Sequence, residues 1–153
     1  LDFKLKDMRK SFDIKYDAVF NLFTSFGYFE NDIDDILVLK NIHDGLNENG
    51  LLVLDFLNVI NVKKKLVKKE IKIIDNITFN LEREIKDGFI IKHINFKDKG
   101  VNHSYSERVK YLDLEKFKSY FIKAGLKINH IFGDYHLTKF NPVTSERLIF
   151  VVS

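Results

Sequence analysis

The stretch that decides the fold is Tyr16-Asp-Ala-Val-Phe-Asn-Leu-Phe-Thr-Ser-Phe-Gly-Tyr-Phe29. Its first part, residues 17–23, is an almost continuous apolar run, which is typical of a strand that is covered on both faces. Its second part is a loop of aromatic and hydroxyl side chains around Gly27. A buried strand that leads directly into such a loop predicts a floor for a ligand at the carboxyl end of the strand.

A helix and a second buried strand are expected next. Asn31 or Asp32 is placed to cap the helix. Apolar residues then recur at helical spacing, at Ile33, Ile36, Leu37, Leu39, Ile42 and Leu46. A turn over residues 47–50 precedes the apolar segment 51–56, which we interpret as the second strand. A strand, a crossover helix and a strand imply a parallel pair with a right-handed connection, the unit of a doubly wound α/β sheet.

Residues 59–111 have a different character. Lysines at positions 63–65, 68 and 69 are followed by segments that alternate between apolar and polar residues. The segments on either side of the turn at residues 86–88 predict an antiparallel hairpin, and residues 104–111 extend it. We expect residues 59–111 to form a β-rich insertion that acts as a substrate lid. It belongs to a single domain that covers residues 1–153, since roughly 50 residues are marginal for an independent core.

The α/β pattern resumes after the insertion. Asp113 predicts the start of a helix and Gly125 its left-handed end, with Leu114, Phe117, Phe121 and Ala124 on one face. Residues 127–132 and 147–152 predict the last two strands, and residues 1–6 predict a short strand at the start. The predicted fold is therefore a partial doubly wound, Rossmann-like α/β sheet with an antiparallel insertion.

Three segments together carry a family resemblance: Asp7-Met8-Arg9, residues 16–29 and Leu51-Leu-Val-Leu-Asp-Phe-Leu-Asn58. They resemble the class I S-adenosylmethionine-dependent methyltransferases, most closely the small-molecule branch that includes amino-sugar N-methyltransferases. In that family the strands lie in the order three-two-one-four-five-seven-six. The segments of this chain correspond to the end of strand three and to strands four to seven.

The resemblance implies S-adenosylmethionine as cofactor and a small molecule as methyl acceptor. The glycine-rich loop that holds the methionine end of the cofactor in that family does not occur in these 153 residues. We therefore expect this to be an N-terminally truncated methyltransferase-like domain, inactive by itself. In the full protein an N-terminal half is expected to supply two further βα units.

The resemblance also implies roles for particular residues. Asp7 would accept a hydrogen bond from the adenine amino group, Met8 would bracket the ring, and Asn21, Leu22 and Phe23 would face the sulfonium. The expected acceptor-binding residues are Phe26, Tyr28, Asp55, Asn58, Arg108 and Asp134. The general base stays open between Tyr28, His103 and Tyr135. No spacing of histidines and carboxylates is typical of a metal site.

Composition limits the alternatives. Lys and Arg total 25 against 22 Asp and Glu, and the net charge of +3 does not by itself indicate a nucleic-acid partner. The chain has no cysteine, which excludes disulfides and thiolate metal sites and favours a cytoplasmic protein. No apolar segment approaches the roughly 20 residues that span a bilayer. Two other functions stay open: an RNA or protein methyltransferase, suggested by lysines 63–69, and a non-catalytic remnant used for binding or oligomerisation.

Overall fold

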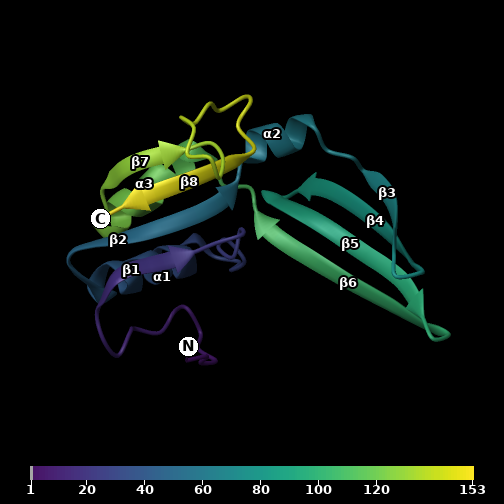
Figure 1. The fold of residues 1–153 in the computed structure, drawn as a ribbon, viewed down its shortest axis with the longest axis horizontal. Coiled ribbons are helices and arrows are strands. Elements are labelled where there is room, and N and C mark those ends of the chain that lie inside the picture. The colour runs from purple at the N-terminus through teal and green to yellow at the C-terminus, as the bar shows by residue number, and fades with distance from the viewer. Residues whose placement is uncertain (1) are drawn as a thin grey trace.

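The computed structural model describes residues 2–153, which form two four-stranded sheets (Figure 1). The first sheet contains β1 (Tyr16–Asn21), β2 (Leu46–Leu57), β8 (Arg147–Val152) and β7 (Ile128–Phe132), in the order β1-β2-β8-β7. β1 and β2 are parallel, and β8 is antiparallel to both β2 and β7. This arrangement confirms the predicted α/β class and the predicted neighbours four-five-seven-six.

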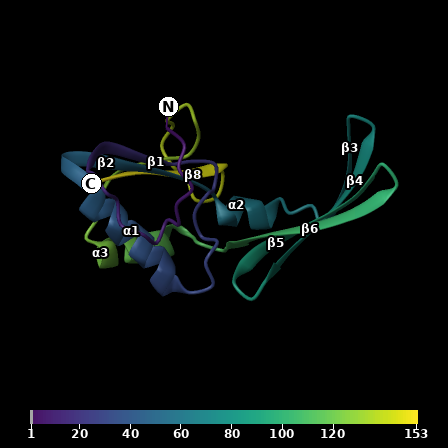
Figure 2. The same ribbon diagram turned by 90° about the horizontal axis from the view of Figure 1, so that it is seen from below.

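Helices α1 (Asp32–Gly45) and α3 (Leu114–Ala124) pack on the same face of this sheet (Figure 2). Aromatic rings fill the space between α3 and the sheet. The ring of Phe117 lies 5.1 Å from that of Phe56 and 5.0 Å from that of Phe150. All three side chains are fully buried, and each contributes about 1.5–3 kcal/mol by leaving water. The core thus holds α3 against the middle of the sheet.

The caps of α3 agree with the sequence prediction. The Asp113 side chain accepts a hydrogen bond from the Lys116 backbone N–H at 2.9 Å, which satisfies one free donor of the first turn. Gly125 ends the helix with a φ of 82°, a left-handed conformation that glycine adopts without strain. Both helix ends are therefore encoded locally.

The second sheet is the insertion. The short helix α2 (Val59–Lys64) leads into β3 (Lys69–Ile74), β4 (Ile77–Lys86), β5 (Phe89–Asp98) and β6 (Val101–Lys110), which pair antiparallel in that order. The predicted hairpin is confirmed, and β3 is an additional strand. Figures 1 and 2 show that this sheet extends away from the carboxyl ends of β1 and β2. Its role as a lid stays a prediction.

Two local predictions were wrong. Residues 2–6 form no strand, because no neighbouring strand pairs with them, and the Phe3 and Leu5 side chains are exposed; Leu1 lies outside the described residues. The turn predicted at residues 47–50 lies within β2 as a bulge. The pairing with β1 jumps there from Tyr16–Leu46 to Ala18–Leu51.

The apolar face predicted for α1 was only partly right. Ile33 is 78% exposed and Leu37 is 39% exposed, whereas Val38, Leu39 and Ile42 are buried. Asp35 occupies a fully buried position on this helix, which a count of apolar residues does not anticipate. Within residues 2–153, no helix is long and apolar enough to cross a membrane.

Candidate functional site

The candidate site lies where β1 and β2 end side by side. Asp55, near the end of β2, is buried and accepts three hydrogen bonds through its carboxylate. The donors are the Phe23 backbone N–H at 2.9 Å, the Tyr135 hydroxyl at 3.0 Å and the Arg147 Nε at 2.7 Å. We refer to Met8, Asn21, Phe23, Asp55, Tyr135 and Arg147 as the strand-tip site.

The backbone after β1 is strained at this site. Phe23 and Thr24 have φ angles of 58° and 61°, in the left-handed region that costs a non-glycine residue about 1–3 kcal/mol. The Thr24 N–H donates to the Asp55 carbonyl at 3.0 Å, and the Thr24 hydroxyl accepts from Arg147 at 3.0 Å. Asp55 and Arg147 thereby hold the strained turn and present the Phe23 ring, which is 76% exposed.

The N-terminal segment reaches the same strand tips. The Asn21 side-chain amide lies 3.9 Å from the Met8 sulfur, and the Asn41 amide donates to the Arg9 carbonyl at 2.7 Å. Asp7 pairs with Arg9 at 2.7 Å. The hydrogen bonds from Arg9 lower the pKa of Asp7 to about 2, so that its carboxylate is ionised and acts only as an acceptor. Met8 therefore lies against Asn21, and Phe23 against Asp55.

The loop from β1 to α1 is tied to the insertion. The Lys110 N–H donates to the Gly27 carbonyl at 2.8 Å, and Arg108 pairs with Glu30. The Arg108 guanidinium also lies over the Phe89 ring, 3.4 Å from its centroid, a cation–π contact. Tyr28 lies in this loop and is 53% exposed. The insertion therefore helps to set the conformation of the loop that follows the strand tip.

Both candidate tyrosines stay protonated at neutral pH. Burial and then the charge of Glu107 raise the pKa of Tyr28 above its ordinary value of 10.0. Burial and then the hydrogen bond to Asp55 raise the pKa of Tyr135 in the same direction. Each phenol can therefore orient a ligand through its hydroxyl, but neither is a ready base in its resting state.

The structure gives three of the predicted acceptor-binding residues other surroundings. Phe26 is fully buried, with its ring 5.9 Å from that of Phe117. Asn58 is 2% exposed and donates to the carbonyls of Pro142 and Ser145. Asp134 accepts from the Thr138 hydroxyl within its own loop. These contacts shape the framework of the site and leave Phe26 and Asn58 no surface for a ligand.

His103 does not lie at the strand tips. It belongs to the distal part of β6, where its ring stacks on Phe96 at 4.8 Å. It lies seven positions before Lys110, where β6 returns to the α/β unit. At about 3.3 Å per residue, this places it roughly 23 Å along the strand. The register of the insertion thus moves this candidate base away from Asp55.

Sequence reasoning missed Arg147 and Thr24. The available signal was Asp55 itself, because a carboxylate within an apolar run requires a buried donor. Nothing in the local pattern shows which donor fulfils this requirement.

The charge of the lysine-rich segment is partly neutralised by ion pairs. Lys65 lies 3.6 Å from Glu146, and Lys69 lies 3.0 Å from Glu82.

Comparisons with known proteins place the fold among solved structures. No protein-family model matches the sequence, and no curated protein matches it significantly. Among solved structures, an S-adenosylmethionine-dependent methyltransferase from Clostridium acetobutylicum superposes with a TM-score of 0.84 at 18% identity, covering 98% of this chain and 63% of that one. The CcbJ methyltransferase from Streptomyces caelestis gives a TM-score of 0.82 at 16% identity, covering 97% and 61%.

A third similar structure is CalS10 from Micromonospora echinaspora, an amino pentose methyltransferase. Its TM-score is 0.65 at 16% identity, with 96% of this chain and 62% of that chain covered. The chain thus has the fold of small-molecule S-adenosylmethionine-dependent methyltransferases over part of their length. It spans about three fifths of each of these solved chains.

Proposed function

We propose that this chain is part of an S-adenosylmethionine-dependent methyltransferase that acts on a small molecule. In this proposal it contacts the adenosine and sulfonium portions of the cofactor and binds the methyl acceptor. The observation that carries the proposal is the strand-tip site. There a buried carboxylate holds a strained turn and an exposed aromatic ring at the ends of two parallel strands. In open α/β sheets, ligands bind at this position.

The residues present fit one part of the cofactor. The ionised Asp7 side chain can accept from the adenine amino group if adenine takes the place of one of the Arg9 donors, which now contact both carboxylate oxygens. Met8 is 39% exposed, which leaves its side chain available to an adenine ring. The exposed Phe23 ring suits a sulfonium, since aromatic faces attract positive charge. When bound, the cofactor supplies the electrophilic methyl group.

We assign the methionine end of the cofactor to additional βα units of the protein, outside these 153 residues. Within residues 2–153, one edge of β1 has no strand paired with it, and Tyr16 and Phe20 are 39% and 64% exposed. An apolar unpaired edge favours the addition of another strand. We propose that additional βα units pair here and hold the methionine end of the cofactor. The coverage of about three fifths of the similar chains supports this.

The contribution of this chain to catalysis is positional. Methyl transfer requires the acceptor atom to approach the methyl carbon in line, within about 3 Å, so orientation supplies much of the rate. We assign this orientation to Tyr28 and Tyr135, whose hydroxyls can hydrogen-bond an amine or hydroxyl of the acceptor. Arg108, in β6, supports Tyr28 by pairing with Glu30, which belongs to the same loop as Tyr28.

The test is a calorimetric titration of the intact protein with S-adenosylhomocysteine, the demethylated cofactor. We expect saturable binding that Asp7→Asn weakens about tenfold, because the amide is a poorer acceptor than the ionised carboxylate. Asp13→Asn is the matched control, since Asp13 makes a similar exposed ion pair with Lys6 at 3.3 Å. An intact protein that does not bind the nucleoside would instead favour a non-catalytic module.

A further inference from the structure

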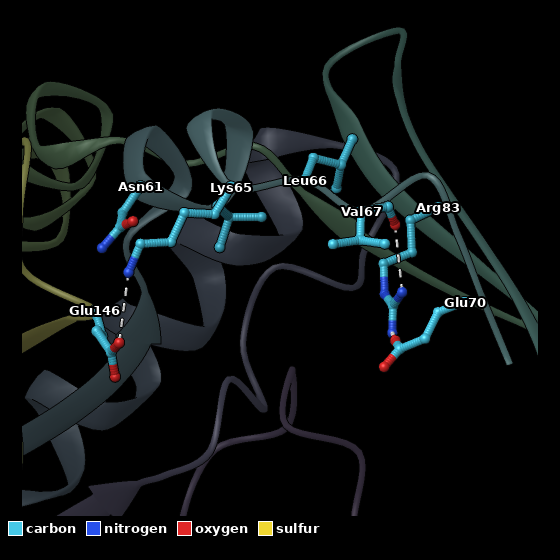
Figure 3. A pocket seen from close by; sticks show the side chains of 8 residues that line it. Asn61, Lys65, Leu66, Val67, Glu70, Arg83 and Glu146 are labelled. Atoms are coloured by element: carbon cyan, nitrogen blue, oxygen red, sulfur yellow. Dashed lines mark hydrogen bonds and ion pairs between the residues drawn. The ribbon is translucent and has the colours of Figure 1, made fainter. Parts of the chain in front are cut away.

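A pocket opens where the insertion joins the α/β unit (Figure 3). It has a volume of about 340 Å³ and lies between α2 and the beginning of the β3–β4 hairpin. We refer to it as the junction pocket, lined by Asn61, Val62, Lys65, Leu66, Val67, Glu70, Arg83 and Glu146. None of these residues belongs to the strand-tip site.

Asn61 gives this pocket an unsatisfied polar group. Its side chain is 4% exposed, and its Nδ2 donates to the carbonyls of Thr144 and Ser145 at 3.1 and 2.8 Å. These two bonds use the amide protons and fix the orientation of the amide. The Oδ1 atom is buried and accepts no hydrogen bond. Figure 3 shows this oxygen turned toward Lys65, with the nitrogen pointing away. Because solvent does not reach this oxygen, a ligand donor can bond to it only after the side chains that cover it move aside. Buried acceptors normally have a partner, so such a donor would satisfy it.

The charges around the pocket are already compensated. Arg83 lies 2.7 Å from Glu70 and also donates to the Val67 carbonyl at 3.3 Å. Lys65 lies 3.6 Å from Glu146. Two cations and two carboxylates leave no net charge, so a charged ligand would have to displace one of these pairs. An uncharged ligand keeps both pairs intact.

We propose that the junction pocket binds an uncharged group that combines an apolar body with one hydroxyl or N–H donor. The donor bonds to Asn61 Oδ1, and the body contacts the apolar wall of Val62, Leu66 and Val67. The volume is at the small end of ligand pockets, about 300–1,000 Å³, and suits a single ring with a short substituent. The identity of the natural ligand rests on the proposed function: the bound group is then a part of the methyl acceptor that lies far from the reacting atom.

The experiment is an NMR titration of the isotopically labelled intact protein with cyclohexylmethanol. Its methyl ether, which has the same apolar body without a donor, is titrated in parallel. We expect the alcohol to shift the Asn61 side-chain amide and the Val62 and Val67 methyl signals, and the ether to bind at least about fivefold more weakly. Equal binding of the two probes, or an absence of shifts at these residues, would overturn the proposal.

Two variants localise the binding. Val62→Trp fills the pocket and should abolish the shifts, whereas Ile60→Trp, at a position on the same helix that is 41% exposed and outside the pocket, should retain them. The alcohol–ether comparison uses the unmodified protein, so it remains decisive even if Val62→Trp does not fold. Binding of S-adenosylhomocysteine should be unchanged in both variants, which separates a failure here from a failure of the proposed function.

Discussion

Asp55 links four segments that are distant in the sequence. Its buried carboxylate accepts from the turn after β1, from the β7–β8 loop through Tyr135, and from the start of β8 through Arg147. A charge in this position is stable only because these donors replace its water. One side chain thus determines both the local strain and the exposure of the Phe23 ring.

Replacing Asp55 by Asn should lower the free energy of unfolding by about 3 kcal/mol. The amide has one acceptor oxygen for three donors and leaves the Arg147 guanidinium, which is 20% exposed, without its counterion. Urea denaturation measures the change. Asp13→Asn is the control, because the Asp13 side chain is 84% exposed and should change stability by less than about 0.5 kcal/mol. A loss below about 1 kcal/mol for Asp55→Asn would mean that Asp55 does not organise the site.

At the scale of elements, the end of β6 is fastened to α1. Lys110 is 5% exposed, and its ammonium lies 2.5 Å from Asp35 and 3.3 Å from Asp32. Burial raises the pKa of Asp35 above 3.8, and the Lys110 charge opposes that rise. For Asp32, burial acts in the same direction, but the hydrogen bonds from Lys116 and Lys110 outweigh it and bring the pKa to about 2. The buried Lys110–Asp35 pair therefore fixes the point at which β6 joins the α/β unit.

Lys110→Met should destabilise the protein by about 3 kcal/mol at pH 7, because it leaves the Asp35 carboxylate buried without a cation. The folded-state pKa of Asp35 then rises further above its unfolded value of 3.8. A carboxyl with a raised folded-state pKa binds its proton more readily when folded. The deficit relative to wild type should therefore shrink as the pH falls from 7 toward 4. Denaturation curves at several pH values measure this.

The double variant Lys110→Met/Asp35→Leu should recover most of the lost stability, since replacing both partners of a buried pair by apolar groups is often neutral. Lys86→Met, at an exposed position at the end of β4 in the same insertion sheet, is the control and should show no comparable pH dependence. A deficit in Lys110→Met that does not vary with pH would exclude Asp35 as its source.

At the scale of the whole molecule, the insertion sheet is supported unequally along its length. Its buried apolar side chains are Leu81, Phe89, Ile90 and Val109, most of them near the α/β unit. Farther out, the Ile73, Val101 and Tyr105 side chains are 72%, 57% and 57% exposed. Figure 1 shows β5 and β6 extending beyond the first sheet. The stability of this sheet should therefore decrease toward its distal turns.

Hydrogen–deuterium exchange followed by mass spectrometry should detect this gradient. Backbone amides of residues 95–102 should exchange about tenfold faster, or more, than those of residues 89–92, because the distal amides are held by few buried apolar contacts. Peptides from β8, which is largely buried, serve as the slow reference. Equal protection at both ends of β5 would show that the distal sheet is covered by another element or partner in solution.

Much of the fold was predictable because it is encoded in neighbouring residues. The apolar runs predict the strands β1 and β2, and Asp113 and Gly125 fix both ends of α3. The prediction that β1 is covered on both faces was wrong, since Tyr16 and Phe20 are 39% and 64% exposed at the unpaired edge of the sheet. Alternation around the turn at residues 86–88 predicts the β4–β5 hairpin. Each of these patterns reflects local backbone geometry or a face that must leave water, so a few residues are sufficient to define it.

The candidate site depended on contacts that no local pattern contains. Arg147 bonds to Asp55 across 92 positions in the sequence, and Lys110 bonds to Asp35 across 75. His103 has the chemistry of a base, but the register of β6 carries it away from the strand tips. The sequence by itself determined the order and type of most elements. Only the tertiary structure decided which buried charges meet, because strand register and packing bring together segments whose local patterns are independent of each other.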